Sequence, residues 1–231
     1  MPDAPAIGGL DGAAAVVTGG GSGIGAAVAD LSASDPVDVT DRGALDRLAR
    51  EVEQARGRLD VLVNAAGVLT PNLPADELPA DDFVRAFEVN VLGTVNACQA
   101  FFPLLRASRG AIVNVASQAA LESLPQQAAY TAAKGAVAAL TRSLAIDWAG
   151  HGIRANAVAP GFTLTPMTEA FFENEVFTEA ATGRIPLGRI LAAEEIAGAI
   201  VFLASPFAQA VTGVTLPVDG GWTAGEPALP W

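Results

Sequence analysis

Short apolar segments rich in strand-forming residues alternate with helical patterns along almost the whole chain. The apolar segments are residues 13–18, 59–67, 111–117, 153–161 and 214–221. Helical spacing of apolar residues is found near residues 41–56, 80–107, 127–149 and 192–204. The apolar segments are continuous rather than alternating in polarity, which is typical of strands covered by helices on both faces. The order of the segments therefore predicts an α/β fold with a doubly wound parallel sheet.

The length and composition of the chain favour a single packed domain. The chain has 231 residues, of which 51% are hydrophobic and 16% are charged. A substantial core can be buried by a chain of this kind, and disorder is not expected. We therefore expect residues 1–231 to form one domain. Within it, residues 162–190 form a long excursion, which is typical of a lid or a binding loop.

A glycine-rich turn follows the first apolar segment. In VVTGGGSGIGAAVA, at residues 16–29, Gly19, Gly23 and Gly25 lie between a strand and a helical pattern. Glycines allow the backbone to turn tightly and to approach a pyrophosphate, and a helix N-terminus favours an anion. The turn therefore predicts a Rossmann-like three-layer sandwich that binds a dinucleotide, with a plain structural turn as the alternative.

The segment after this turn is unusually short. A full helix, a second strand ending in an acid that binds the adenine ribose, and usually another helix are expected before the third strand. Only AAVADLSASDPVDVTD is available, and its Asp-Pro pair at 35–36 ends any helix within about two turns. Asp38, nineteen residues after Gly19, is a candidate for the ribose-binding acid. Alternatively, VDVTD is a later strand whose aspartate, with Val39 beside it, meets the adenine. Asp30 is a second candidate, and solvated acids on a short connection are the remaining possibility.

The only tyrosine and the only lysine of the chain lie four residues apart, in AAYTAAKG at 128–135. The surrounding sequence has helical spacing, so Tyr130 and Lys134 are expected to face the same pocket. A nearby ammonium group favours the phenolate and moves the phenol pKa from about 10 towards neutral pH, where tyrosine can act as an acid or base. An ordinary surface pair is the alternative when the pair is taken alone.

Further motifs accompany this pair: NAAG at 64–67, Asn90 in NVLG, Ser117 in NVAS and PGFTLT at 160–165. With the glycine turn, they make the sequence resemble the short-chain dehydrogenase/reductase family over residues 14–222. In the family pattern an Asn, a Ser, a Tyr and a Lys form a catalytic tetrad. The intervals from Asn90 onwards are 27, 13 and 4 residues, which fit that pattern.

The resemblance implies an NAD(P)-dependent enzyme that interconverts a secondary alcohol and a ketone. It assigns Tyr130 as general acid/base and Ser117 as the group that orients the substrate oxygen. Lys134 would lower the tyrosine pKa and bind the nicotinamide ribose, and Asn90 would hold a water of the proton relay. The alternative is a non-catalytic dinucleotide-binding or interaction protein of the same fold with an impaired adenosine site.

The resemblance also implies a cofactor-binding set and no metal site. Ala65 stands where the commonest family form of NAAG has a second asparagine. The short segment after Gly25 is the larger departure: either the deletion is real and the adenosine pocket is rebuilt, or residues of this segment are missing from the sequence. The implied set, in chain order, is Gly19, Ser22, Gly23, Ile24, Gly25, Asp38, Val39, Asn64, Ala65, Gly67, Tyr130, Lys134, Pro160, Gly161, Thr163 and Thr165.

Charges near the glycine turn favour NAD over NADP, which stays as the alternative. No Arg or Lys lies between Gly19 and Asp41, whereas aspartates stand at 30, 35, 38 and 41. A 2′-phosphate would meet carboxylates there. Arg42 is the one cation that can reverse this preference.

Composition excludes several other functions. The net charge of −12 disfavours nucleic acid and membrane partners. No secretory signal is visible, and the longest apolar run, IAGAIVFLA, is far shorter than a bilayer span, so we expect a cytoplasmic protein. Cys98 and His151 are the only residues of their types, which leaves no Ser/His/Asp or Cys/His hydrolase to assemble and no zinc site built on several thiolates.

The excursion at 162–190 carries four phenylalanines and four glutamates between Phe162 and Glu179. In a helix, the phenylalanines can close over a substrate while the glutamates face water; a solvated helix packed on the body is the alternative. So acidic a lid favours a neutral polyol, sugar or hydroxy-ketone. The helical stretches at 80–107 and 127–149 carry more apolar residues than one sheet face can cover, which suggests a homo-oligomer, either a dimer or a tetramer.

Overall fold

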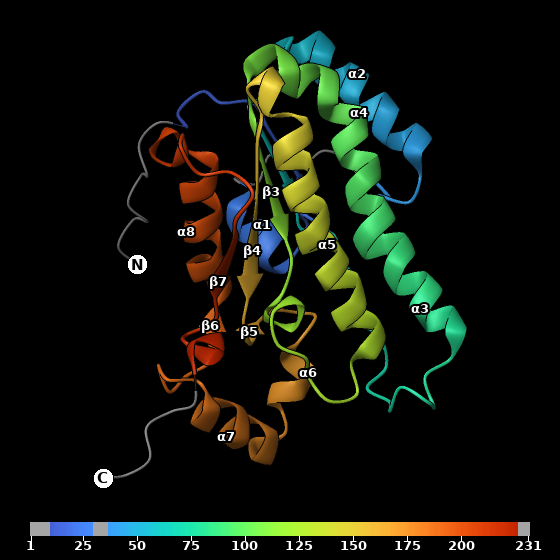
Figure 1. Ribbon diagram of the computed structural model, residues 1–231, viewed down its shortest axis with the longest axis vertical. Coiled ribbons are helices and arrows are strands. Elements are labelled where there is room, and N and C mark those ends of the chain that lie inside the picture. The colour runs from blue at the N-terminus through green and yellow to red at the C-terminus, as the bar shows by residue number, and fades with distance from the viewer. Residues whose placement is uncertain (1–9, 30–36, 226–231) are drawn as a thin grey trace.

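The computed structural model describes residues 10–29 and 37–225, which contain a five-stranded parallel sheet flanked by helices (Figure 1). The strand order is β1-β2-β3-β4-β7, and every neighbouring pair is parallel. Each strand lies within one of the apolar segments, so the predicted α/β class and parallel sheet are confirmed. The strands are β1 Ala15–Thr18, β2 Val61–Asn64, β3 Ala111–Val115, β4 Arg154–Pro160 and β7 Thr215–Val218.

Helices cover both faces of the sheet, as the continuous apolar strands require. On one face, β2 and β3 pack through Leu62 and Ile112 against α2, α4 and α5; on the other, Val63 and Val113 pack against α8 and α1. Neighbouring residues of one strand thus enter opposite cores, because side chains alternate along a strand. The helices are α1 Gly23–Val28, α2 Arg42–Arg56, α3 Ala80–Phe87, α4 Gly93–Ser108, α5 Ala128–Asp147 and α8 Ala193–Ala204.

Local signals explain where α2 begins and ends. The Asp41 carboxylate accepts a hydrogen bond from the Ala44 N–H, which satisfies one of the free donors of the first turn. The helix ends at Gly57, which has a left-handed φ of 68° that glycine adopts without strain. The predicted helical stretch 41–56 is therefore confirmed to within one residue.

The helical stretch expected at 80–107 is interrupted. A π-helical turn, Glu88–Leu92, separates α3 from α4. Such turns insert an extra residue into a helix and are frequent at functional sites. This one contains Asn90, which is 1% exposed, so the interruption falls on a residue that the sequence had already singled out.

The short segment after the glycine turn leaves β1 at the edge of the sheet. Among the described residues β1 pairs only with β2, and α1 ends at Val28, as the short segment predicts. Asp38 does not belong to a strand: residues 38–41 form a turn, in which the Asp38 carboxylate accepts hydrogen bonds from the Thr40 N–H and hydroxyl. The interpretation of VDVTD as a strand is therefore wrong, because the Asp38 side chain takes a backbone N–H that a strand would offer to its neighbour. Asp30 and the pair at 35–36 lie outside the described residues.

The excursion at 162–190 folds over the carboxyl ends of the strands (Figure 1). It begins with β5 Thr163–Leu164, which pairs with β6 Leu191–Ala192, and it contains α6 Glu169–Phe172 and α7 Glu175–Arg184. The Phe162 ring makes edge contacts with Phe172, Phe177 and Trp222. The aromatic residues of the excursion thus pack against one another.

A ladder of buried polar side chains ties α5 to the sheet. Asn64 at the end of β2 donates its Nδ2 to the Asn114 Oδ1 at 2.9 Å, and the Asn114 Nδ2 donates to the Thr141 Oγ1 of α5 at 2.9 Å. Asn114 and Thr141 are fully buried and Asn64 is nearly so. Because α5 also carries Tyr130 and Lys134, these hydrogen bonds fix the position of both side chains relative to the strands.

No helix within residues 10–29 and 37–225 has both the length and the apolar character that crossing a membrane requires.

Replacing Asn114 with alanine should destabilise the fold, because the change leaves the Asn64 amide and the Thr141 hydroxyl buried with fewer partners. We expect the free energy of unfolding to fall by about 2 kcal/mol or more, measured by urea denaturation. The exposed amide of Asn72 offers a matched control, since Asn72→Ala should change the same quantity by less than about 0.5 kcal/mol. Equal effects of the two substitutions would contradict the role of the ladder.

Candidate active site

A cavity of about 190 Å³ opens where the strands end, and most of the residues singled out in the sequence line it. The turn after β1, the NAAG segment after β2, Ser117 after β3 and the Pro-Gly pair at the end of β4 meet here, because the carboxyl ends of parallel strands share one edge of a sheet. The predicted residues in the lining are Gly19, Ser22, Gly23, Ile24, Gly25, Ala65, Gly67, Asn90, Ser117, Tyr130, Lys134, Pro160, Gly161, Thr163 and Thr165.

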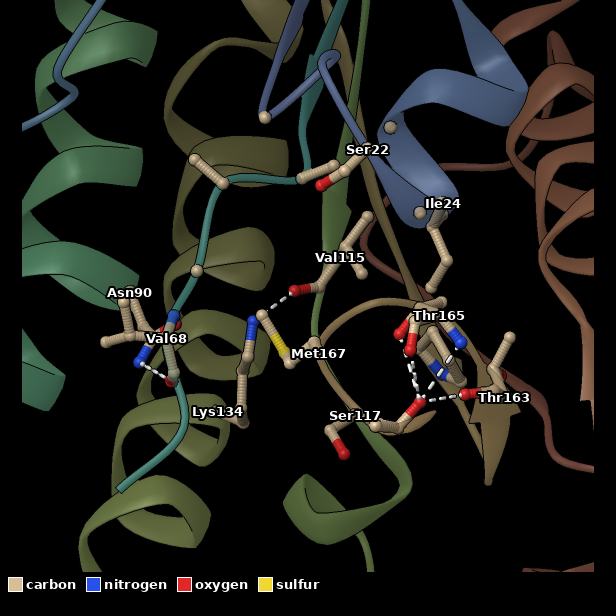
Figure 2. A pocket seen from close by; sticks show the side chains of 18 of the residues that line it. Ser22, Ile24, Val68, Asn90, Val115, Ser117, Lys134, Thr163, Thr165 and Met167 are labelled. Carbon is tan, nitrogen blue, oxygen red and sulfur yellow. Dashed lines mark hydrogen bonds between the residues drawn. The ribbon is translucent and has the colours of Figure 1, made fainter. Parts of the chain in front are cut away.

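Lys134 is buried in the wall of this cavity with one hydrogen bond. Its side chain is on α5, the residue is 5% exposed, and the Nζ donates to the Val115 carbonyl at the end of β3 at 2.8 Å (Figure 2). Burial lowers the pKa of Lys134 to about 8, since removal from water penalises the ammonium form. An ammonium group has three donors, so further donors remain for a group bound in the cavity.

Tyr130 lies one helical turn before Lys134, as its spacing predicts. The Lys134 Nζ is 5.7 Å from the centroid of the tyrosine ring. Burial raises the pKa of Tyr130, and a hydrogen bond with Ser117 opposes this effect. The sequence had suggested a lowered pKa. The difference arises because desolvation of the phenol penalises the charged phenolate, and this effect on the pKa of Tyr130 exceeds the opposing effect of the Ser117 hydrogen bond.

Ser117 and Asn90 are held firmly at the edge of the cavity. The Ser117 Oγ accepts a hydrogen bond from the Ala119 N–H at 3.1 Å, which fixes the hydroxyl at the start of a short 3₁₀ turn. The Asn90 side chain clasps the backbone of Val68: its Oδ1 accepts from the Val68 N–H at 3.0 Å and its Nδ2 donates to the Val68 carbonyl at 3.1 Å (Figure 2). Asn90 therefore positions the segment that follows β2.

Glycines allow segments of the cavity wall to approach one another more closely than a side chain would permit. A Cβ on Gly19, whose φ is 70°, would come within 2.7 Å of the Ala66 backbone nitrogen. A Cβ on Gly67 would lie 2.7 Å from the Asn90 Oδ1 and 3.4 Å from the Lys134 Nζ. A cradle of backbone beside a buried amine is what close approach of a nucleotide requires, so these residues fit a nicotinamide cofactor. Gly67, which the family pattern places beside the adenosine half, lies here next to Lys134 and Asn90.

Three predicted cofactor residues lie outside the cavity. The Asn64 amide points into the sheet, where it donates to Asn114 and to the Cys98 sulfur at 3.3 Å. Val39 is buried against Gly93. The Asp38 carboxylate is occupied by Thr40, whose hydrogen bonds lower the pKa of Asp38. Three of the residues expected at the adenosine end are therefore not brought together with the others, whereas Gly67 and the residues expected at the nicotinamide end are.

Sequence reasoning missed several residues of the lining, and among them Thr168 makes the most side-chain hydrogen bonds. Its hydroxyl donates to the Thr163 carbonyl and accepts from the Thr165 N–H at 3.1 Å, and it lies 3.0 Å from the Thr165 hydroxyl. Figure 2 shows this network beside Thr163 and Thr165. The repeated threonines after the Pro-Gly pair were the available signal, but helical or strand periodicity does not reveal a turn of this kind. Val68, Val115 and Met167 also line the cavity.

Across the described parts of the chain, no cluster of three or more His, Cys, Asp and Glu side chains is placed to hold a metal ion. Cys98 is buried, and burial raises the pKa of its thiol to about 12. That thiol is therefore an inert part of the core.

Comparison with known proteins extends these observations. A family model described as enoyl-(acyl carrier protein) reductase matches residues 19–223. The chain is 41% identical to 2-(R)-hydroxypropyl-CoM dehydrogenase of Xanthobacter autotrophicus over 81% of this chain and 76% of the relative. It is 37% identical to D-threitol dehydrogenase of Mycolicibacterium smegmatis over 93% of this chain and 94% of the relative. The crystal structure of a gluconate 5-dehydrogenase from Burkholderia cenocepacia in complex with NADP and tartrate superposes with a TM-score of 0.86 at 32% identity, over 93% and 96% of the two chains.

Lys134 is the only lysine, so lysine-selective isotope labelling gives one set of side-chain NMR signals. The chemical shift of its ε-carbon should titrate with a midpoint near pH 8. The folded state then binds fewer protons than the unfolded state, whose lysine titrates near the ordinary value of 10.5. The cost of the buried charge is fully present below about pH 8, so wild-type stability relative to Lys134→Met should rise between about pH 8 and 10.5. A midpoint above 10 would contradict the burial of the amine.

Proposed function

Since this chain belongs to the short-chain dehydrogenase/reductase family, we propose that its cavity is the active site and that Asn90, Ser117, Tyr130 and Lys134 are the catalytic residues. The protein is an NAD(P)-dependent oxidoreductase that interconverts secondary alcohols and ketones. The observation that carries the residue assignment is the convergence of the Lys134 amine, the Tyr130 phenol and the Ser117 hydroxyl in one cavity.

Each of these side chains has a role that its contacts support. Tyr130 exchanges the proton of the substrate hydroxyl, and Ser117 donates a hydrogen bond to the oxygen as negative charge develops on it. Lys134 offers its remaining donors to ribose hydroxyls, and when protonated it favours the phenolate of Tyr130. Asn90 holds the Val68 segment in place at the other wall. When bound, the nicotinamide supplies the acceptor or donor of the hydride.

We assign the cofactor-binding role to the residues of the lining and favour NAD over NADP by a small factor. Arg42, the one cation that could reverse the preference, has its guanidinium engaged by Asp46 at 2.8 Å and by Gln99 at 2.7 Å. Asp38 and Asp41 remain as negative charges after the glycine turn. A 2′-phosphate would therefore meet a weakly unfavourable field, which solvent screens. A cytoplasmic location, where such a cofactor is recycled, is part of the proposal.

The substrate that we propose is a neutral polyol or hydroxy-ketone. Among the described residues of the lining, Lys134 is the only charged one, and Ser117, Thr163, Thr165 and Thr168 supply hydroxyl groups. An anionic substrate would find no arginine in this lining. The relative named for D-threitol is consistent with a polyol.

Residues 162–190 are proposed to act as the lid of a single domain. The turn from Thr163 to Thr168 already lines the cavity. The Arg184 guanidinium at the end of α7 pairs with Glu122, in the loop between Ser117 and α5, and lies 4.2 Å from the centroid of the Trp222 ring system. These contacts connect the lid to the loop that follows Ser117.

Tyr130→Phe should lose at least about a hundredfold in turnover, because phenylalanine cannot exchange the proton, while binding of NAD and thermal stability stay close to wild type. Turnover is measured at 340 nm in a screen of neutral polyols and ketones with both cofactors, and binding by calorimetry. Arg142→Ala, at an exposed position of the same helix, is the control and should keep normal turnover. Near-normal activity of Tyr130→Phe would refute the assignment, and wild-type protein that binds neither cofactor would refute the function.

We also propose that the protein is a homo-oligomer that associates through α3 and the π-helical turn. Val84 is 55% exposed, Phe87 38% and Leu92 53%, and these side chains adjoin one another around a shallow hollow. A second copy of the chain is the occupant that we infer, because a symmetric pair of such faces buries both at once.

Light scattering should therefore give a mass of two or four times 23.4 kDa. Leu92→Glu places a charge in the proposed contact and should shift the mass towards the monomer, because an unpaired buried charge is costly. Val176→Glu, at a 77% exposed position of α7, should leave the mass unchanged. A monomeric wild type would overturn the proposal.

A further inference from the structure

The cavity stops at the glycine turn. Its lining comes from residues 19–25 and from positions at and beyond Ala65, and none of the described residues between 26 and 64 contributes to it. The side chains that gather at the far end belong to Ser117, Tyr130 and Lys134. The site is therefore complete at one end and bounded by the turn at the other.

The residues that could extend the cavity are engaged elsewhere. Asn64 is 3% exposed and donates to Asn114 and Cys98. Val39 is 6% exposed, packs on Gly93, and its carbonyl accepts a hydrogen bond from the Asn96 amide at 3.1 Å. To contact a ligand, either side chain would have to break buried contacts, which costs free energy that the ligand would have to supply.

Within residues 10–29 and 37–225, the sheet has no strand beyond β1 on which an adenosine group could bind. In a doubly wound sheet the two halves of a dinucleotide bind over two groups of strands on either side of the switch point. Here β1 is the edge strand in the part of the chain that the structure describes. The half of the sheet that carries β2, β3 and β4 is present and bears the nicotinamide-side residues.

The nicotinamide end, in contrast, offers groups ready to bind. Lys134 spends one of its three donors on the Val115 carbonyl, and the Ser117 hydroxyl lines the same end of the cavity. Gly67 and Gly161 let neighbouring groups of the lining pack closely: a Cβ on Gly67 would lie 2.7 Å from the Asn90 Oδ1, and a Cβ on Gly161 would lie 2.7 Å from the Asp219 Cα. Recognition of a nucleotide is thus concentrated on the ribose and ring of one half.

We propose that this enzyme binds its cofactor through the nicotinamide half and accepts a nicotinamide mononucleotide as a working cofactor. The proposal rests on the oxidoreductase function proposed above. In the reaction, the C–H bond of the alcohol breaks and its two electrons and hydrogen pass as hydride to the oxidised mononucleotide. The hydroxyl proton leaves through Tyr130, so that the products are a ketone, the reduced mononucleotide and one proton.

The proposal predicts that the three nicotinamide ligands bind with similar affinities. If the adenosine half contributes little, the Kd values for the mononucleotide, NAD and NADP should agree within about tenfold, which corresponds to about 1.4 kcal/mol. Adenosine and adenosine monophosphate, which lack the nicotinamide ribose, should bind at least about a hundredfold more weakly than NAD. An enzyme that uses both halves would instead bind NAD more than about tenfold more tightly than the mononucleotide.

The test is calorimetry on the full chain with five ligands: nicotinamide mononucleotide, NAD, NADP, adenosine and adenosine monophosphate. Two variants accompany it. Lys134→Met should weaken binding of the mononucleotide and of NAD by the same factor, because both use the same amine. Asp38→Ala, outside the cavity, should leave both Kd values unchanged. Turnover with the reduced mononucleotide and a ketone, followed at 340 nm, is a second readout.

The outcomes separate the two proposals. Affinities for the mononucleotide and NAD that agree within about tenfold, with weak adenosine and adenosine monophosphate, support the inference. NAD binding that is more than about tenfold tighter than mononucleotide binding, or adenosine monophosphate binding within about a hundredfold of NAD, overturns the inference and leaves the oxidoreductase function standing. Binding of none of the nicotinamide ligands overturns both.

Discussion

The burial of the Lys134 amine is the constraint on which the rest of the site depends. A lysine that is 5% exposed loses much of its hydration, and a single hydrogen bond to the Val115 carbonyl replaces only part of it. The pKa of Lys134 falls to about 8 as a result. The amine therefore stays close to the balance between its charged and neutral forms at working pH, where a bound partner can shift it.

Such a group can be kept in place only by a rigid frame. The frame here is the sheet end and α5, which the Asn64, Asn114 and Thr141 side chains hold together through buried hydrogen bonds. The clasp of Asn90 on the Val68 backbone and the turn around Thr168 complete the walls. Burying these polar groups lowers the free energy of unfolding, and the apolar cores on the two faces of the sheet offset that loss. The site lies at the end of the sheet, between these two cores.

The fold could be predicted from the sequence because its signals are local. Continuous apolar runs identified the five strands, and the spacing of Tyr130 and Lys134 placed both on one helix face. For Asp38 the strand interpretation was wrong, because its carboxylate accepts hydrogen bonds from Thr40 two residues away, and the alternative of an exposed acid on a short connection agrees with the structure. Asn64 was assigned to the cofactor, but it donates across the sheet to a residue fifty positions later, and no local pattern reveals that partner. Thr168 escaped notice because its hydrogen bonds form within an irregular turn.

By itself, the sequence determined the class of fold, the family pattern and the residues able to do the chemistry, since helix and strand periodicities and a four-residue spacing are properties of neighbouring residues. Only the tertiary structure decided which of these residues share a cavity. It placed Gly67 beside Asn90 and Lys134, left Asp38, Val39 and Asn64 outside, and set the direction of the Tyr130 pKa. These outcomes depend on burial and on contacts between segments far apart in the chain, which local sequence patterns do not encode.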